Sequence, residues 1–249
     1  MNHEILMETE VDGAEPYAAL LRRVIPAVLE AEGVPFSVET DKVDEEDWAT
    51  AWKKYYFPTW VGERLVVCPS WEDYAPAPGE VVLTMDPGMA FGTGTHDTTR
   101  LCMQLLEKYA APGVKLLDVG TGSGILAVAA LLLGADSAVG VDIDEVAVRV
   151  AKENAAANGV GDRAAFLAGD LADRVDGRFA VVTANIVADV ILRLIPDLGR
   201  FLEPGGVFIA SGIIDTREAD VVSALEGAGY RLADRRESGG WVALAAVRG

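Results

Sequence analysis

Short apolar runs and amphipathic runs alternate regularly along the second half of the chain. The clearest example spans 114–142, VKLLDVGTGSGILAVAALLLGADSAVGVD. Its pattern predicts a strand over 115–119 that is buried on both faces, an alanine-rich helix over 125–133 and a second buried strand over 137–141. Glycines at alternate positions separate the first strand from the helix. This order of elements predicts a βαβ unit with parallel strands.

The same alternation continues to the end of the chain. It predicts further strands and helices at 165–169, 179–184, 187–200, 207–211 and 216–228, and a closing hairpin at 230–236 and 241–247. We therefore expect an α/β fold, with a doubly wound, mostly parallel seven-stranded sheet, one antiparallel strand and helices on both faces.

The part of the chain before this sheet has a different pattern. Residues 1–43 predict two short strands and one helix, which make a poor independent core. Residues 44–80 are rich in aromatic side chains, which favour either a linker helix docked on the larger domain or an aromatic wall for a peptide substrate. We thus predict three parts: a small N-terminal α/β piece at 1–43, an aromatic linker at 44–80 and the main domain at 81–249.

Composition and charge narrow the possible partners. The formal net charge is −18, which disfavours nonspecific binding to a phosphate backbone and suits a basic protein partner, although an acidic surface can also serve solubility alone. The two cysteines, Cys68 and Cys102, lack the spacing of metal ligands. The longest apolar run is shorter than the roughly 20 residues that cross a bilayer, and the first residues lack a signal-peptide pattern. We expect a cytoplasmic protein without a metal, a membrane contact or direct nucleic-acid binding.

The glycine-rich turn after the first buried strand carries the first candidate chemistry. Its order is G-x-G-x-G, at Gly120, Gly122 and Gly124, and Asp118 lies two residues before it. A dinucleotide site would use G-x-G-x-x-G, and a carboxylate here disfavours a pyrophosphate and suits a ligand with a cationic end. Asp142 ends the next strand, where it can accept hydrogen bonds from both ribose hydroxyls. The alternative is an ordinary βαβ crossover whose glycines only fit a tight turn.

A second stretch, 86–99, has the sequence DPGMAFGTGTHDTT. Its backbone amides and hydroxyl groups could close over a ligand, and Phe91 could cover an aromatic ring. Thr95 or His96 could cap the helix that follows. His96 is an alternative candidate for a proton carrier, although a single histidine is more often a structural hydrogen-bonding group.

These stretches together resemble the bacterial ribosomal protein methyltransferase family, whose members modify protein eleven of the large ribosomal subunit. The resemblance rests on MDPGMAFGTGTHDTT at 85–99, DVGTGSGILAVAA at 118–130, TANIVADVI at 183–191 and EPGGVFIASGII at 203–214, and it extends in order and spacing over 44–249. It implies a class I methyltransferase fold with S-adenosylmethionine as cofactor. It also implies N-methylation of lysine or N-terminal amines on a basic ribosomal protein substrate.

The resemblance also implies the site residues. The contacts with S-adenosylmethionine correspond to Thr99, Gly120, Asp142 and Asn185, with Gly122 and Phe91 in the same pocket and Asp170 near the adenine amino group. Asn185 is the catalytic candidate, because its amide oxygen can accept a hydrogen bond from the attacking amine and orient the lone pair toward the methyl group. The alternative for Asn185 is the N-cap of the next helix.

One departure from the family keeps several functions open. Family members usually carry a longer N-terminal substrate-recognition domain, so we expect 1–43 to be a shortened one. The candidates are a methyltransferase for the ribosomal protein, a methyltransferase for another protein or a small amine, and a module that binds S-adenosylmethionine without transfer. Asn185 and the complete glycine turn disfavour the last, and Asp118 disfavours an NAD-dependent oxidoreductase. The sequence does not determine the oligomeric state.

Overall fold

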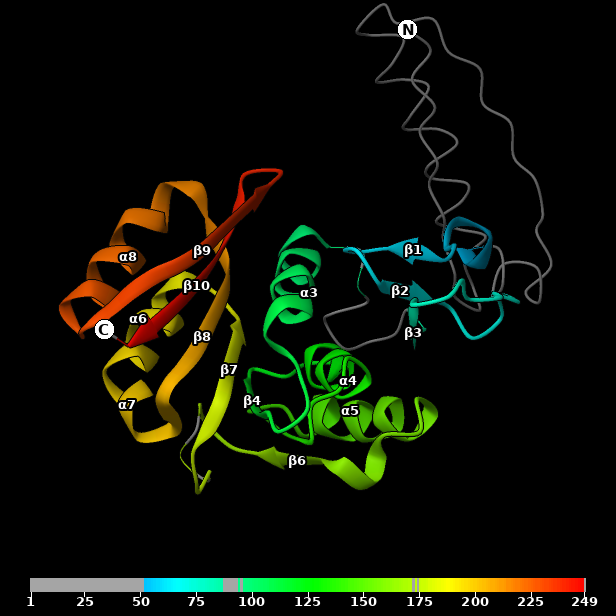
Figure 1. Ribbon diagram of the computed structural model, residues 1–249, viewed down its shortest axis with the longest axis horizontal. Coiled ribbons are helices and arrows are strands. Elements are labelled where there is room, and N and C mark those ends of the chain that lie inside the picture. Colours follow the sequence, from blue (N-terminus) through cyan, green and yellow to red (C-terminus); the bar gives the residue numbers. More distant parts are fainter. Residues whose placement is uncertain (1–51, 87–93, 95, 172, 174, 249) are drawn as a thin grey trace, which may run out of the picture. The chain divides into compact units, whose positions relative to one another are not determined.

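The computed structural model describes residues 52–86, 94, 96–171, 173 and 175–248 (Figure 1). Residues Tyr55–Gly249 form one compact unit. The small piece expected at 1–43 and the start of the aromatic linker lie outside the described residues. The three-part division made at residues 43 and 80 therefore stays a prediction.

The main sheet has seven strands in the spatial order β6-β5-β4-β7-β8-β10-β9. The parallel neighbours are β6 (Ala164–Ala168), β5 (Ser137–Asp142), β4 (Lys115–Val119), β7 (Phe179–Asn185) and β8 (Leu202–Ile214). Strand β10 (Trp241–Arg248) runs antiparallel to both β8 and β9 (Tyr230–Ser238). It is thus the single antiparallel strand of this sheet, and the predicted sheet is confirmed.

The central strands are apolar on both faces because both faces are covered by helices. Successive side chains of a strand point to opposite faces, so Leu116 belongs to one apolar cluster and Leu117 to the other. The neighbouring strand divides in the same way at Val181 and Val182. This explains why these strands are mostly apolar in the sequence.

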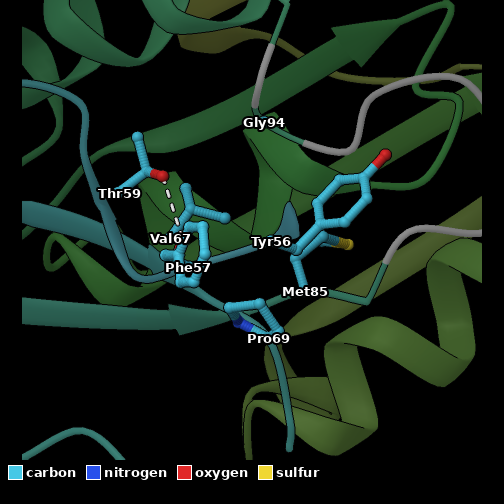
Figure 2. Close-up of a pocket in the computed structure, with 7 residues that line it drawn as sticks. All are labelled: Tyr56, Phe57, Thr59, Val67, Pro69, Met85 and Gly94. Atoms are coloured by element: carbon cyan, nitrogen blue, oxygen red, sulfur yellow. Dashed lines mark hydrogen bonds between the residues drawn. The ribbon is translucent and has the colours of Figure 1, made fainter. Parts of the chain in front are cut away.

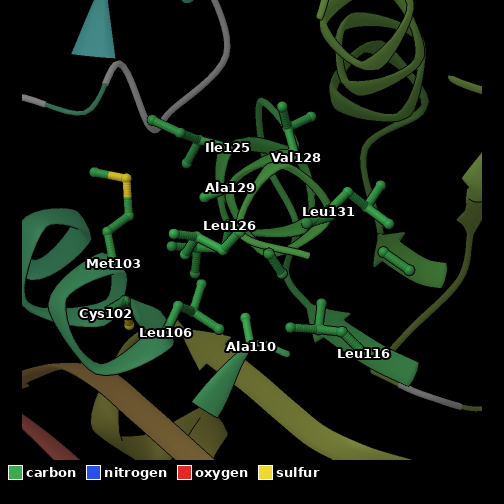
Figure 3. Packing of buried hydrophobic residues seen from close by; sticks show 14 of the residues in the cluster. Cys102, Met103, Leu106, Ala110, Leu116, Ile125, Leu126, Val128, Ala129 and Leu131 are labelled. Carbon is green, nitrogen blue, oxygen red and sulfur yellow. The ribbon is translucent and has the colours of Figure 1, made fainter. Parts of the chain in front are cut away.

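Helices α3 (Asp97–Tyr109), α4 (Ile125–Leu132) and α5 (Glu145–Ala157) lie on one face of the main sheet, and α6 (Ala188–Leu194), α7 (Leu198–Phe201) and α8 (Glu218–Gly227) lie on the other (Figure 1). Figure 3 shows the first of these layers, where Met103 and Leu106 of α3 pack near Leu126 of α4. Every residue of α4 from Ile125 to Leu131 is buried, which explains its apolar, alanine-rich sequence.

Short 3-10 helices divide two of the predicted helices. The helix expected at 187–200 consists of α6, the 3-10 helix η3 (Ile195–Asp197) and α7. Pro196 lies at the start of η3, and it has no N–H group with which to continue α6. Likewise, η4 (Asp215–Arg217) precedes α8, and η2 (Gly161–Arg163) follows α5. Among the described residues, no helix is both long and apolar enough to span a membrane.

A second, three-stranded sheet contains β1 (Thr59–Trp60), β2 (Leu65–Cys68) and β3 (Val81–Thr84). Strand β2 pairs antiparallel with β1 and parallel with β3. The sequence pattern predicts neither β1 nor β2. The described end of the expected linker helix is a short 3-10 helix, η1 (Trp52–Tyr55).

Two polar side chains of α3 bind the turn between β1 and β2. The Glu107 carboxylate accepts hydrogen bonds from the backbone N–H groups of Glu63, Arg64 and Leu65 at 2.7, 2.8 and 2.7 Å. One turn earlier on α3, Gln104 Nε2 donates to the carbonyl oxygen of Val61 at 2.8 Å. The turn between β1 and β2 is therefore fixed to the helix that leads toward the candidate site.

Candidate active site

The candidate site lies at the C-terminal ends of β4, β5 and β7. Strands β4 and β7 are neighbours in the sheet. The chain leaves β4 toward α4 on one face and leaves β7 toward α6 on the opposite face (Figure 1). Such a switch point opens a crevice beyond the strand ends, where open α/β sheets bind their ligands.

The glycine turn after β4 needs glycine for two separate reasons. Gly120, Gly122 and Gly124 have φ values of 72, 54 and 80°, in the left-handed region that favours glycine. A Cβ atom on Gly120 would lie 2.4 Å from Cγ2 of Ile186, and one on Gly124 would lie 2.8 Å from Cβ of Ala151. The turn therefore packs closely against Ile186, which directly follows β7, and against α5, and no side chains project from these glycine positions.

Asp142 ends β5 and is oriented by backbone donors on both sides. Its Oδ2 accepts a hydrogen bond from the N–H of Gly122 at 2.8 Å, and its Oδ1 accepts one from the N–H of Asp144 at 3.0 Å. The side chain is partly buried. An ionised carboxylate has about four lone-pair positions, so two remain for the hydroxyl groups of a ligand.

Asn185 ends β7, and its side chain contacts α3. Its Nδ2 donates a hydrogen bond to Oγ1 of Thr99 at 3.2 Å, which brings together two of the predicted site residues. Helix α6 begins at Ala188 with Val187 as its N-cap, so the alternative role of Asn185 as the helix cap is not observed. With its nitrogen directed to Thr99, the amide presents its oxygen as an acceptor.

Asp118 differs from the expectation drawn from the sequence. Its side chain is fully buried, with Oδ2 accepting from Oγ1 of Thr121 and Oδ1 from Oγ1 of Thr183, both at 2.7 Å. Burial raises its pKa to about 6, against the opposing effect of these hydrogen bonds. The expectation that this carboxylate faces the ligand is wrong, because Asp118 lies within a strand that helices cover on both sides.

The remaining candidates lie around this crevice or outside the described residues. Asp170 follows β6, whose Ala168 pairs with Asp142 on β5, and its exposed carboxylate lies 3.6 Å from Arg193. Asp170 therefore follows the strand that neighbours Asp142, and its assignment to the adenine amino group stays a prediction. Phe91 lies outside the described residues.

His96 has the capping role that the sequence suggested. Its ring accepts a hydrogen bond from the N–H of Thr98 at the start of α3, and its Nδ1 lies 2.8 Å from Oγ1 of Thr98. The ring also packs edge-on against Trp241, with ring centroids 5.3 Å apart. These contacts account for a histidine at this position without a proton-transfer step.

An apolar pocket lies beside the loop that leads into α3 (Figure 2). It is lined by residues of the small sheet and its flanking segments: Tyr56, Phe57, Thr59, Val67, Pro69, Met85 and Gly94. Two aromatic side chains of the expected linker, Tyr56 and Phe57, thus line this pocket. The linker-helix and aromatic-wall interpretations both stay predictions.

Two functional candidates were missed in the sequence, Thr121 and Thr183. Both are buried polar residues beside the site, at 4 and 0% exposure. The available signal was a threonine within an otherwise apolar strand, since a buried hydroxyl needs a hydrogen-bonding partner.

The described residues contain no group of side chains suited to hold a metal ion. Burial raises the thiol pKa of both Cys68 and Cys102.

Comparison with known proteins gives a consistent result. The family described as "Ribosomal protein L11 methyltransferase (PrmA)" matches residues 8–249. The match therefore includes most of the N-terminal piece, whereas the resemblance described from the sequence begins only at residue 44.

Individual relatives agree with the family match. A ribosomal protein L11 methyltransferase of Pelotomaculum thermopropionicum is 54% identical over 238 residues, which are 96% of this chain and 75% of the relative. One of Desulforamulus reducens is 50% identical over 219 residues, 88% of this chain and 71% of the relative. A crystal structure of ribosomal protein L11 methylase from Lactobacillus delbrueckii subsp. bulgaricus has 38% identity and a TM-score of 0.73, covering 78% of this chain and 99% of that one.

Proposed function

Because this chain belongs to the ribosomal protein L11 methyltransferase family, we propose that it methylates amines of ribosomal protein L11 through the crevice between β4 and β7. It is a methyltransferase that uses S-adenosylmethionine. The observation that carries the proposal is the convergence of the glycine turn, Asp142 and Asn185 at one switch point.

The residues of the crevice fit S-adenosylmethionine by their chemistry. The bare backbone at Gly120 and Gly122 leaves room for close approach, and the two remaining lone-pair positions of Asp142 suit a pair of ribose hydroxyls. We assign Asp170 to the adenine amino group and Phe91 to the adenine ring. When bound, S-adenosylmethionine supplies an electrophilic methyl group on a sulfonium.

Asn185 would act on the substrate amine. Its amide oxygen can accept one N–H of a neutral amine, which orients the nitrogen lone pair, and Thr99 keeps the amide in place. The protein mainly supplies alignment, since holding two reactants in the right geometry contributes much of the acceleration of such a step. Removal of water from the amine lowers its pKa and favours the neutral, reactive form.

The surroundings of Asn185 favour a substrate with an aliphatic stem and a positive charge. Strands β7 and β8 pair at Asn185 and Ser211. Two exposed apolar residues lie at the ends of these strands: Val187 follows β7 at 64% exposure, and Ile214 ends β8 at 44%. Such residues suit the methylene groups of a lysine side chain. The net charge of −18 suits a basic ribosomal protein.

The experiment is transfer of labelled methyl groups from S-adenosylmethionine to purified ribosomal protein L11. We expect labelling by the wild type and a loss of about 10²-fold or more in Asn185→Ala, because the reacting amine is no longer oriented. Asn158→Ala is the matched control: its amide bonds Thr84 and Asn154 away from the crevice, and it should keep transfer.

Two outcomes would contradict parts of the proposal. Binding of S-adenosylmethionine by calorimetry without labelling of L11 would reject L11 as the substrate and keep the cofactor site. Full activity of Asn185→Ala would reject the role assigned to Asn185.

A further inference from the structure

The buried carboxylate of Asp118 connects two parts of the site that are far apart in sequence. One oxygen accepts from Thr121 in the glycine turn, and the other accepts from Thr183 on β7. We propose that Asp118 is a positioning residue that holds the cofactor-binding turn and the Asn185 strand in a fixed relative geometry. This inference rests on the function proposed above, in which the turn binds S-adenosylmethionine and Asn185 orients the amine.

The first arm of this connection runs to the ribose-binding side. Thr121 immediately precedes Gly122, whose N–H donates to the Asp142 carboxylate at 2.8 Å. The turn has few side chains to hold it, and Gly124, the N-cap of α4, makes no side-chain cap. The backbone N–H of Ala127 in the first turn of α4 also contributes to lowering the pKa of Asp118. The carboxylate therefore faces the start of the helix whose glycine N-cap offers no side-chain acceptor.

The second arm runs to the amine-binding side. Asp118 and Thr183 are direct neighbours in the register of β4 and β7. Thr183 and Asn185 are two residues apart on one strand, so their side chains point to the same face of the sheet. A hydrogen bond that fixes Thr183 against Asp118 thus also fixes where the Asn185 amide lies relative to the glycine turn.

The chemistry of Asp118 also favours a functional role over simple packing. Asp118 and Thr183 are fully buried, and Thr121 is 4% exposed, so the carboxylate acts through its internal hydrogen bonds. A buried carboxylate is unfavourable for folding compared with a well-packed neutral residue. Retaining it at the junction of both halves is expected where geometry matters more than stability.

Substitutions of Thr183 and Thr121 test the two hydrogen bonds of Asp118 separately. We expect Thr183→Val to lower kcat at saturating S-adenosylmethionine by about tenfold, because misplacement of a reacting group by about 1 Å can cost up to about 10²-fold. Its Kd for S-adenosylmethionine, measured by calorimetry, should stay within about twofold of the wild type. We expect the reverse for Thr121→Val, with Kd raised about tenfold, the equivalent of one lost hydrogen bond, and a smaller change in kcat.

Further variants control for structural damage. Thr183→Ser keeps the hydroxyl and should restore kcat, and Thr183→Ala takes the place of Thr183→Val if the latter does not fold. Val182→Ala lies on the same strand but faces the opposite apolar cluster, so it should lower Tm without separating kcat from Kd.

The inference is overturned if the threonine variants change kcat and Kd together, or by no more than Val182→Ala does. It is also overturned, with the proposed function intact, if Asn185→Ala loses transfer while Thr183→Val keeps full kcat. If Asn185→Ala itself keeps full kcat, the role of Asn185 in the proposed function fails instead.

Discussion

The main sheet and the small sheet share an apolar cluster and differ in how much polar side chains add to it. The main sheet is packed by two large apolar clusters, one on each face. The small sheet contributes Leu65, Val67 and Leu83 to the first of these clusters. Polar side chains also bind its backbone: Glu107 accepts from three backbone N–H groups, and Asn158 bonds both the N–H and the carbonyl of Thr84. Apolar burial thus builds the scaffold of the site, and directional hydrogen bonds add to it in the small sheet.

The largest loss of stability should follow from a cavity in the main sheet. Phe208 is fully buried in β8, and we expect Phe208→Ala to lower the free energy of unfolding by about 3–5 kcal/mol. Phe57→Ala removes an aromatic ring that is 61% exposed, and it should change the free energy of unfolding by less than about 1 kcal/mol. Urea unfolding measures the free energy of unfolding of both variants. A similar loss in the two variants would contradict the assignment of the main core.

The next effect concerns the buried charge in the main sheet. The pKa of Asp118 is raised from 3.8 to about 6 by burial. Below pH 3.8 the carboxyl group is mostly protonated in both the folded and the unfolded protein. Above pH 6 the folded protein holds a buried negative charge. The stability that the protonated Asp118 contributes is therefore lost as pH rises through this range. Asp118→Asn does not titrate there.

We therefore expect Asp118→Asn to gain on the order of 3 kcal/mol over the wild type between pH 4 and pH 7. Denaturant unfolding of both proteins at each pH measures the difference. A difference that is constant with pH would mean that Asp118 titrates normally, and a difference of opposite sign would mean that its charge stabilises the fold.

The sequence predicted the main sheet because its physics is visible in local patterns. Strand β4 and helix α4 are apolar on nearly all sides, and a sheet buried on both faces requires this composition. Strands β1 and β2 were missed because β1 has only two residues and Glu107, which binds the turn between them, is more than 40 residues away in sequence. Patterns within a short window cannot detect such a contact.

For the candidate site, the sequence predicted which residues belong to it better than it predicted the surroundings of each residue. The contact of Asn185 with Thr99 could not be predicted from spacing, but both residues were named through the family resemblance. Asp118 was noticed and assigned to the wrong environment. The sequence shows a carboxylate near a glycine turn, and only the register of β4 against β7 shows that Thr183 covers it.

Removal of the Glu107 contacts should loosen the small sheet alone. Glu107→Ala leaves three backbone N–H groups without their acceptor, and because two of these lie at exposed residues we expect a loss of about 1–2 kcal/mol. Hydrogen exchange should accelerate at Glu63 and Leu65 and stay slow in β7.

Glu153→Ala is the matched control, because Glu153 is an exposed helical glutamate 4.0 Å from Arg149. Equal acceleration in β7 after Glu107→Ala would show that the two sheets unfold as one unit, and the comparison between them would fail.

The smallest effect should come from a polar contact between the main sheet and one of its covering helices. Arg235 on β9 binds the Glu218 carboxylate on α8 through two nitrogens, with Nη2 at 2.8 Å from Oε2. This ion pair should add little stability, because buried apolar residues such as Val221 and Leu225 already hold α8 in place. We expect a coupling energy below about 1 kcal/mol in a double-mutant cycle of Arg235→Ala and Glu218→Ala, measured by urea unfolding. A larger coupling would show that hydrogen-bonded pairs also hold the helices on the main sheet, and the contrast between the two sheets would then fail.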